Sequence, residues 1–293
     1  MENDHRLPPP VSDRPFGTQA TVPSTTIIIV AWRLDAGLSR CLEALATTVG
    51  PSSEVIVVGN GIDPGSCVSV LEEAGLTGRT IVLADNHGPS PARNAGASRA
   101  AGQLLLFLDD DSVPEPAWVT AHQIAHEEPG VQGVRGRLVA DNSPFLTRLA
   151  RAYDLGDAPR RAVLNTEGNM SVKAESFRTV GGFAPIFGHE GVELTARLIE
   201  KHGAESIRYT PDAVVRHDYV DSFSDYLAKR FRHGRMMRRL DMKQVRMAAG
   251  IRRTRSPWDM LVAPLRLVGA SVELAGVLWP TRSRAALGIR TDE

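Results

Sequence analysis

Apolar runs of strand length alternate with amphipathic stretches through the first third of the chain. Thr26–Ala31 is rich in β-branched residues, and Leu38–Thr47 has the apolar spacing of a helix. The alternation continues with predicted strands at Glu54–Val58, Thr80–Leu83 and Leu104–Leu108, and with predicted helices near Ser66–Ala74 and from about Pro91 to Ala101. Strands that alternate with helices form βαβ units, so the pattern predicts an α/β fold with a mostly parallel central sheet and helices on both faces.

The second half of the chain is less regular. Gly203 follows a helical pattern at Glu190–His202 and is a typical helix C-cap. The other predicted elements are strands at Val131–Val139, Gly168–Val172 and Ser206–Tyr209, and helices at Phe145–Leu155, Ala174–Val180 and Ser222–Leu240. The N-terminal stretch has four prolines before residue 20 and no apolar run. We therefore expect a mobile tail over residues 1–22, one domain over 23–220 and a basic helical C-terminal region over 221–293.

Charge is balanced over the whole chain, with 34 basic and 34 acidic side chains, but it is unevenly placed. Residues 229–255 hold eleven Lys or Arg and one Asp. Leu261–Trp279 is apolar but contains Pro264, Arg266 and Glu273, which favours a helix lying on a surface over one that spans a membrane. Two cysteines fit a reducing compartment. We expect a cytoplasmic protein with peripheral contact to the anionic inner face of a membrane, and no nucleic-acid partner.

Ligands of open α/β sheets bind beyond the carboxyl ends of the strands. The residues that follow the predicted strands are Trp32, Asn60, Asp85 and the triplet Asp109–Asp111. Three adjacent carboxylates repel one another and raise each other's pKa unless a cation lies among them. A divalent ion held by one or two of them and by a diphosphate satisfies this triplet. The alternative is a solvated turn in which Asp111 or Ser112 caps a helix that begins near Pro114 or Pro116.

Four ordered segments resemble the family 2 glycosyltransferases, which have the GT-A fold. They are PARNAG (91–96), GQLLLFLDDDSVPEP (102–116), GNMSVKAESFRTVGGF (168–183) and GHEGVELTARL (188–198). The resemblance covers roughly residues 25–220. It implies transfer of a sugar from a nucleotide-diphosphate sugar to an acceptor hydroxyl, with Mn²⁺ or Mg²⁺ as the cofactor.

The resemblance also implies roles for single residues. Asp111 stands where the family has a metal ligand, with Asp109 as a second metal ligand. Asp109 and Asp110 are expected to face the ribose or to bridge through the ion. Arg93 is expected to reach the nucleotide or its diphosphate, a natural use of a guanidinium. His217 resembles the histidine that completes the metal site in part of the superfamily.

Two departures from the family pattern leave questions open. The usual Glu-Asp pair reads Glu190-Gly191, so the aspartate taken as the base in inverting members is absent. Glu190 or Glu193 is then expected to meet the acceptor hydroxyl, and inversion and retention both stay open. Asn60 stands where an aspartate usually faces the nucleotide base. Because an amide can pair with a uracil edge, Asn60 favours a UDP-sugar.

Three further alternatives remain at this point. Gly59 to Gly65 followed by Asp85 imitates a dinucleotide fingerprint, which would indicate a Rossmann NAD(P)-dependent oxidoreductase. The loss of the usual base allows a non-catalytic relative that only binds a nucleotide sugar. The acceptor is either lipid-linked, with its phosphates on the basic helix from Lys229 to Arg239, or a small molecule.

Overall fold

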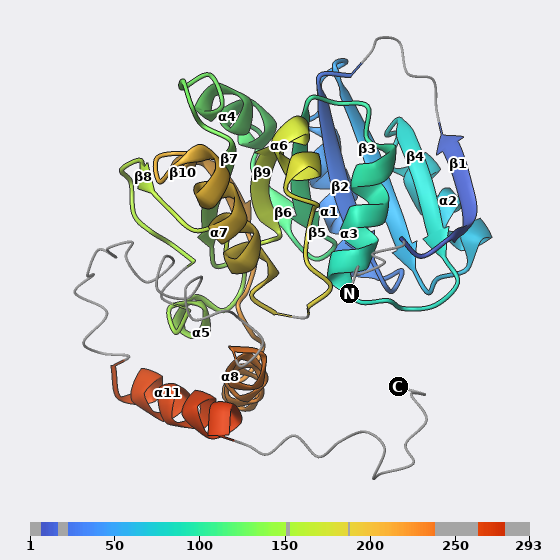
Figure 1. Cartoon of the computed structure of the whole chain (residues 1–293). Coiled ribbons are helices and arrows are strands. Elements are labelled where there is room, and N and C mark those ends of the chain that lie inside the picture. The colour runs from blue at the N-terminus through green and yellow to red at the C-terminus, as the bar shows by residue number, and fades with distance from the viewer. Residues whose placement is uncertain (1–6, 17–22, 151–152, 187, 238–262, 279–293) are drawn as a thin grey trace, which may run out of the picture.

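The computed structural model describes residues 7–16, 23–150, 153–186, 188–237 and 263–278. Its centre is one mixed sheet with helices on both sides (Figure 1). The strands are β1 (Pro10–Phe16), β2 (Thr25–Ala31), β3 (Ser53–Asn60), β4 (Gly78–Leu83), β5 (Leu104–Asp109), β6 (Val113–Pro114), β7 (Gly133–Val139), β8 (Arg160–Arg161), β9 (Asn169–Lys173) and β10 (Ile207–Arg216). The helices are α1 (Ala36–Ala46), α2 (Pro64–Glu73), α3 (Pro89–Arg99), α4 (Trp118–Ala125), α5 (Pro144–Thr147), α6 (Ala174–Thr179), α7 (Glu190–His202), α8 (Phe223–Met237) and α11 (Ala263–Leu278).

The strand order is β1-β4-β3-β2-β5-β9-β7-β10-β6, and β8 pairs with β10. Strands β4, β3, β2 and β5 are parallel, as the βαβ pattern predicts. Strand β9 runs antiparallel to both of its neighbours, β5 and β7, so the sheet is mixed beyond β5. The carboxyl ends of β2, β3 and β5 meet at one edge of the parallel half, and this edge carries the candidate site.

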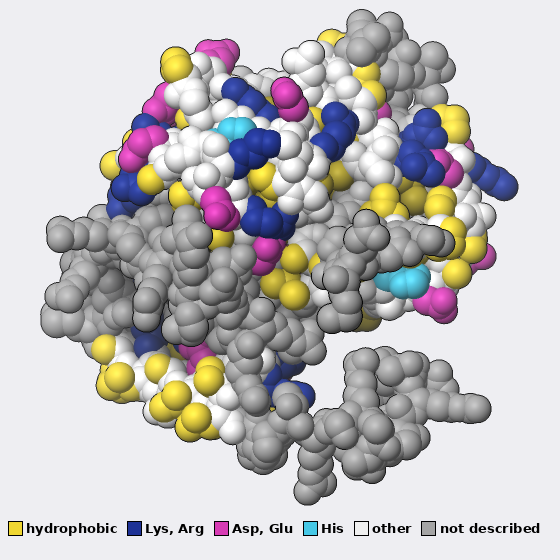
Figure 2. Space-filling view, viewed as in Figure 1, with side chains coloured by type: hydrophobic (Ala, Val, Ile, Leu, Met, Phe, Trp, Pro, Cys, Tyr) yellow, Lys and Arg dark blue, Asp and Glu magenta, His cyan; other side chains and the backbone are white. Residues whose placement is uncertain are grey.

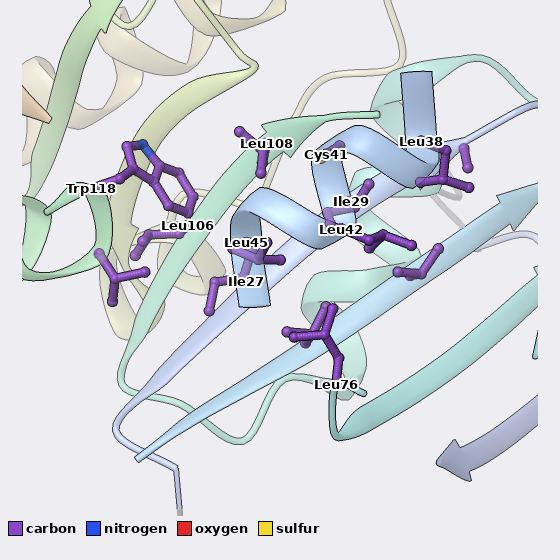
Figure 3. Packing of buried hydrophobic residues seen from close by; sticks show 14 of the residues in the cluster. Ile27, Ile29, Leu38, Cys41, Leu42, Leu45, Leu76, Leu106, Leu108 and Trp118 are labelled. Carbon is purple, nitrogen blue, oxygen red and sulfur yellow. The ribbon is translucent and has the colours of Figure 1, made fainter. Parts of the chain in front are cut away.

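Alternation along the strands places a hydrophobic core on each face of the sheet. On β2, Ile27 and Ile29 pack under α1, α2 and α4, whereas Ile28 faces the core under α3, α6 and α7. Figure 3 shows the first core, in which the α1 side chains Leu38 and Leu42 lie over β2. Because both faces of the sheet are covered, the sequences of the central strands are almost continuously apolar.

The predicted tail is wrong for part of its length, because Pro10–Phe16 forms β1 and pairs antiparallel with β4. The strand covers the free edge of β4, and Asp13 forms ion pairs with Arg79 (2.5 Å) and Arg99 (2.8 Å). Proline lacks a backbone N–H group, and an edge strand tolerates it because only one side of such a strand is paired. Residues 1–6 and 17–22 of that predicted tail lie outside the described residues.

Two predicted helices are wrong in extent. The helix expected to begin near Pro114 or Pro116 begins at Trp118, because Val113–Pro114 pairs with β10 as strand β6. No side chain caps that helix, so neither Asp111 nor Ser112 has the capping role. The helix expected at Phe145–Leu155 is the single turn α5, and its preceding loop is tied to Asp218, whose carboxylate accepts three backbone N–H groups.

The C-terminal region packs against the domain through α8. Tyr219, Val220 and Tyr226 form a small core with Leu149, and Leu265 of α11 packs onto it. Helices α8 and α11 contact each other closely, and Arg230 of α8 pairs with Glu273 of α11. The predicted helix ends Leu240, Leu261 and Trp279 lie outside the described residues. In the part of the chain that is described, no helix is both long and apolar enough to cross a membrane.

Candidate active site

An arginine and two carboxylates from three different elements meet beyond the carboxyl end of β5. Arg93 of α3 donates from Nη2 to Asp109 Oδ1 at 2.7 Å, and its Nη1 lies 3.8 Å from Glu190 Oε1 of α7. The Arg93 side chain is buried, with 8% exposed. Burial opposes its charge, but Asp109, Glu190 and Glu167 together raise the pKa of Arg93 above its usual value. This guanidinium therefore joins α3, β5 and α7 at one point.

The last carboxylate of the triplet, Asp111, lies in contact with His217. His217 Nε2 is 3.2 Å from Asp111 Oδ1, and His217 follows β10. Burial opposes the charge of both groups, but their mutual hydrogen bond lowers the pKa of Asp111 and raises that of His217. The structure thus brings together two side chains that are 106 positions apart in the sequence and that were predicted to share a metal ion.

Asp110 has a raised pKa mainly because its side chain is buried, and its two neighbouring carboxylates contribute less. Its side chain is buried, and burial raises its pKa to about 7, with Asp111 and Asp109 adding to the effect. Asp109 and Asp110 differ in access, because 37% of the Asp109 side chain is exposed. A carboxyl with a raised pKa beside an ionised neighbour is the environment that a bound cation relieves.

The donor types at this edge fit a divalent ion. Gly168 backs directly onto Asp109, since a Cβ at residue 168 would lie 2.1 Å from Asp109 Oδ2, and a larger residue would displace the carboxylate. Within the described ranges, no three His, Cys, Asp or Glu side chains already converge as a complete metal site. Mg²⁺ and similar ions bound to nucleotides need only one or two carboxylates, with phosphate oxygens and water completing the shell.

The two glutamates predicted on α7 have different surroundings. Glu190 is buried, and burial together with the charge of Glu167 raises its pKa to about 7. Glu193 forms an ion pair with Arg197, which also donates to the carbonyls of Val180 and Gly182. Glu193 therefore holds Arg197 onto the turn after α6, whereas Glu190 faces Arg93.

The residues predicted to bind the nucleotide lie at the ends of β2, β3 and β4. Asn60 donates from Nδ2 to Asn86 Oδ1 at 2.9 Å, and its Oδ1 accepts from His87 N at 3.0 Å. Its amide thus shapes the loop after β4, and contact with a nucleotide base stays a prediction. Asp85 is exposed at the start of that loop. Trp32 is 54% exposed, with the Arg33 guanidinium stacked 4.6 Å from its ring centroid.

The dinucleotide alternative does not fit the turn between β3 and α2. Asp63 caps α2 by accepting from the N–H and hydroxyl of Ser66 at 2.9 and 3.0 Å. This carboxylate occupies the helix N-terminus where a pyrophosphate would have to bind.

Two charged residues of the site have no clear signal in the sequence. Glu167 lies in the loop before β9 and accepts from Gly191 N at 2.7 Å. Lys229 of α8 donates to the Tyr219 carbonyl at 3.0 Å, and its ammonium lies over the Tyr219 ring. Burial lowers the pKa of Lys229, while the charges of Asp109 and Asp111 oppose this. In the sequence Lys229 is one of several basic residues in a run, and only the fold brings its charge within range of Asp109 and Asp111.

Comparisons with known proteins identify sequence relatives and similar folds. The sequence model of a family described as "Glycosyl transferase family 2" matches residues 26–186. A pre-mycofactocin glycosyltransferase of Mycobacterium tuberculosis is 28% identical over 225 residues, which cover 71% of this chain and 46% of that protein. Glycosyltransferase AglE of Haloferax volcanii is 25% identical over 244 residues, covering 77% of this chain and 79% of AglE. The chain thus spans about half the length of the M. tuberculosis relative.

Solved structures of similar shape carry nucleotides and metal. The mannosyltransferase PcManGT from Pyrobaculum calidifontis, in complex with GDP-Man and Mn²⁺, has a TM-score of 0.59 at 16% identity, covering 92% of this chain and 79% of that one. Residues 1–349 of TarS from S. aureus, in complex with UDP-GlcNAc, have a TM-score of 0.53 at 15% identity, covering 87% and 81%. At these identities the likeness shows the GT-A fold and nothing finer.

Proposed function

Because the chain belongs to glycosyl transferase family 2, we propose that it transfers a sugar from a nucleotide-diphosphate sugar to an acceptor hydroxyl. The observation that carries this proposal is the meeting of Asp111 with His217 beside the Arg93–Asp109 pair at the carboxyl edge of the sheet. It supports nucleotide binding, because ligands of open α/β sheets bind beyond the carboxyl ends of the strands.

We propose that Asp109, Asp111 and His217 hold a divalent ion, Mn²⁺ or Mg²⁺. Such an ion would neutralise the charge of the leaving diphosphate when bound. Support comes from the donor types and from Gly168, because the Asp109 carboxylate occupies the space that a side chain at residue 168 would fill. The PcManGT structure contains Mn²⁺ and GDP-Man together.

The donor lies, in this proposal, across the ends of β2, β3 and β5. Exposed Trp32 and Asp85 border the nucleotide, and Asp110 faces the ribose. We favour a UDP-sugar because the Asn60 amide matches a uracil edge, although Asn60 must then exchange one of its present loop contacts. Arg93 keeps Asp109 oriented and can reach the diphosphate through its second nitrogen.

We propose further that α11 brings the site to an anionic membrane, where a lipid-linked acceptor would be found. Leu267, Leu274 and Leu278 follow at helical spacing and are 69%, 57% and 71% exposed. Figure 2 shows hydrophobic side chains gathered over this helix at the lower left. Of the predicted basic surface, Lys229 and Arg230 face inward, and Arg232 and Arg235 are exposed, while Arg238 and Arg239 lie outside the described residues.

A thermal-shift screen of UDP-, GDP- and dTDP-sugars with and without Mn²⁺ tests the donor proposal. A ligand that binds only the folded state raises the melting temperature by mass action. We expect one nucleotide class to raise it, and only when Mn²⁺ is present. No shift with any donor would contradict the proposal. Mn²⁺-dependent binding without release of nucleoside diphosphate would identify a non-catalytic binding protein.

A further inference from the structure

The start of α7 has no room for a side chain at residue 191. A Cβ there would lie 1.6 Å from the Leu164 carbonyl oxygen and 2.7 Å from Glu167 Oε1. The Gly191 N–H donates to that same Glu167 oxygen at 2.7 Å. The space beside the helix N-terminus is therefore filled by a carboxylate that comes from the loop before β9.

Glu167 belongs to the charged cluster already described. Its charge acts on Arg93, on Glu190 and on Lys229, which lie on α3, α7 and α8. The next residue, Gly168, is the one that backs onto the Asp109 carboxylate. Glu167 therefore lies between the start of α7 and the carboxyl edge of β5.

The three glutamates near this point differ in what they can still bind. Glu190 is 5% exposed and is turned to Arg93, and Glu193 is paired with Arg197. Glu167 is half-buried. Its Oε1 accepts from Gly191 N, and among the described residues no hydrogen bond reaches its Oε2. An oriented carboxylate with one oxygen held and the other open can accept a proton from a bound hydroxyl.

We propose that Glu167 is the base that takes the proton of the acceptor hydroxyl, and that Glu190 is a positioning residue that holds Arg93. The proposal rests on the proposed transferase function. The acceptor O–H bond breaks, and its proton goes to Glu167 Oε2. The freed oxygen lone pair forms the bond to the anomeric carbon of the sugar. The bond from that carbon to the diphosphate breaks, and its electron pair leaves with the nucleoside diphosphate.

The Gly191 N–H gives Glu167 a fixed orientation. This hydrogen bond holds Oε1 against the start of α7 and leaves Oε2 for a bound hydroxyl. The glycine in place of the family's aspartate then does not indicate a lost base. It lets a carboxylate from another segment take the same place, and a side chain at residue 191 would displace it.

The test uses the full chain and needs no known acceptor, because water serves as the acceptor. Release of nucleoside diphosphate is measured from UDP-glucose, UDP-N-acetylglucosamine and GDP-mannose with Mn²⁺, and donor Kd is measured by calorimetry. The variants are Glu167→Gln, Glu167→Asp and Glu190→Gln, with Glu175→Gln, an exposed position on α6, as the matched control.

We expect Glu167→Gln to lower the release rate by roughly 10²–10⁴ while donor Kd changes less than about twofold. Glu190→Gln should instead weaken donor binding, because Arg93 loses a partner, and Glu175→Gln should match the wild type. If Glu167→Gln also lowers the melting temperature, Glu167→Asp separates a loss of the base from a loss of folding. It restores the charge and the fold, but the carboxylate is one methylene short, so the rate should stay reduced.

Wild-type release by Glu167→Gln, or a loss of rate at unchanged Kd in Glu190→Gln alone, would overturn the assignment and return the role of base to Glu190. A wild-type chain that neither binds nor cleaves any of the donors would contradict the proposed function itself. The two failures are therefore distinguishable.

Discussion

Asn94 and Phe183 are joined by a reciprocal pair of hydrogen bonds across 89 positions of sequence. Asn94 Nδ2 donates to the Phe183 carbonyl at 2.8 Å, and Phe183 N donates to Asn94 Oδ1 at 2.9 Å. Gly182, at φ +69°, brings its backbone so close that a Cβ would lie 2.7 Å from Asn94 Oδ1. The Arg-Asn pair thus has divided roles, since Arg93 gathers the carboxylates and Asn94 fixes α3 to the turn after α6.

Replacing Asn94 with alanine should lower the free energy of unfolding by about 1–3 kcal/mol, because two backbone groups of Phe183 lose their partner. Chemical denaturation measures this change. Asn142→Ala, at an exposed position, is the matched control and should cost less than about 0.5 kcal/mol. Equal costs for the two variants would show that the Asn94 bonds contribute nothing specific.

The buried His122 of α4 and the half-buried His126 at its C-cap predict a pH-dependent stability. Burial lowers the pKa of His122 to about 4 and that of His126 to about 3, from an ordinary value of 6.5. Both hydrogen-bond to Ser171 of β9. Between pH 6.5 and about 4 the unfolded chain binds more protons than the folded one. The free energy of unfolding therefore falls as pH falls, by up to about 1.4 kcal/mol per pH unit for each histidine.

Denaturant titrations at pH 6.0, 5.5 and 5.0 measure that slope. His126→Gln keeps a hydrogen-bonding group beside Ser171 and removes one titrating site. Its slope should be smaller than the wild-type slope by roughly one proton's contribution. Identical slopes in the two proteins would mean that His126 is not held neutral in the folded protein.

The sequence predicts the parallel half of the fold well, because β2, β3 and β5 carry strong apolar runs between amphipathic helices. It does not predict β1, whose PVSDRPF lacks an apolar pattern and which forms because β4 leaves an edge to pair. The same holds for the two residues of β6, which depend on β10.

The site residues divide in the same way, into those with a sequence pattern and those that depend on the fold. Asp109–Asp111 and Arg93 stand out in the sequence, because charge directly after a buried strand is conspicuous. Glu167 does not, since a single glutamate in a loop has no pattern, and its role depends on the empty position at Gly191. His217 can be suggested by resemblance, but its contact with Asp111 requires β10 to lie beside β7 and β6.

The exposed apolar face of α11, together with the exposed Arg232 and Arg235 of α8, predicts binding to anionic vesicles. Sedimentation with anionic and with neutral vesicles, at low and high salt, measures it, and we expect binding to anionic vesicles that weakens with salt. Leu267→Ser with Leu274→Ser should remove most of the binding. Ile124→Ser, which is 59% exposed on α4, is the control and should not change it. Equal partitioning to both vesicle types, or none, would reject the membrane contact.

The claim on which the rest depends is that Asp111 holds a divalent ion against the donor diphosphate. Calorimetric titration of UDP and of GDP into the wild-type chain and into Asp111→Asn, each with Mn²⁺ and with EDTA, tests it most directly. Asparagine keeps the size of the side chain and removes its charge. We predict that the wild type binds one of the two nucleotides in Mn²⁺ and that either EDTA or Asp111→Asn weakens binding at least about tenfold, or about 1.4 kcal/mol. Equal affinity of Asp111→Asn and the wild type in Mn²⁺ would contradict the account.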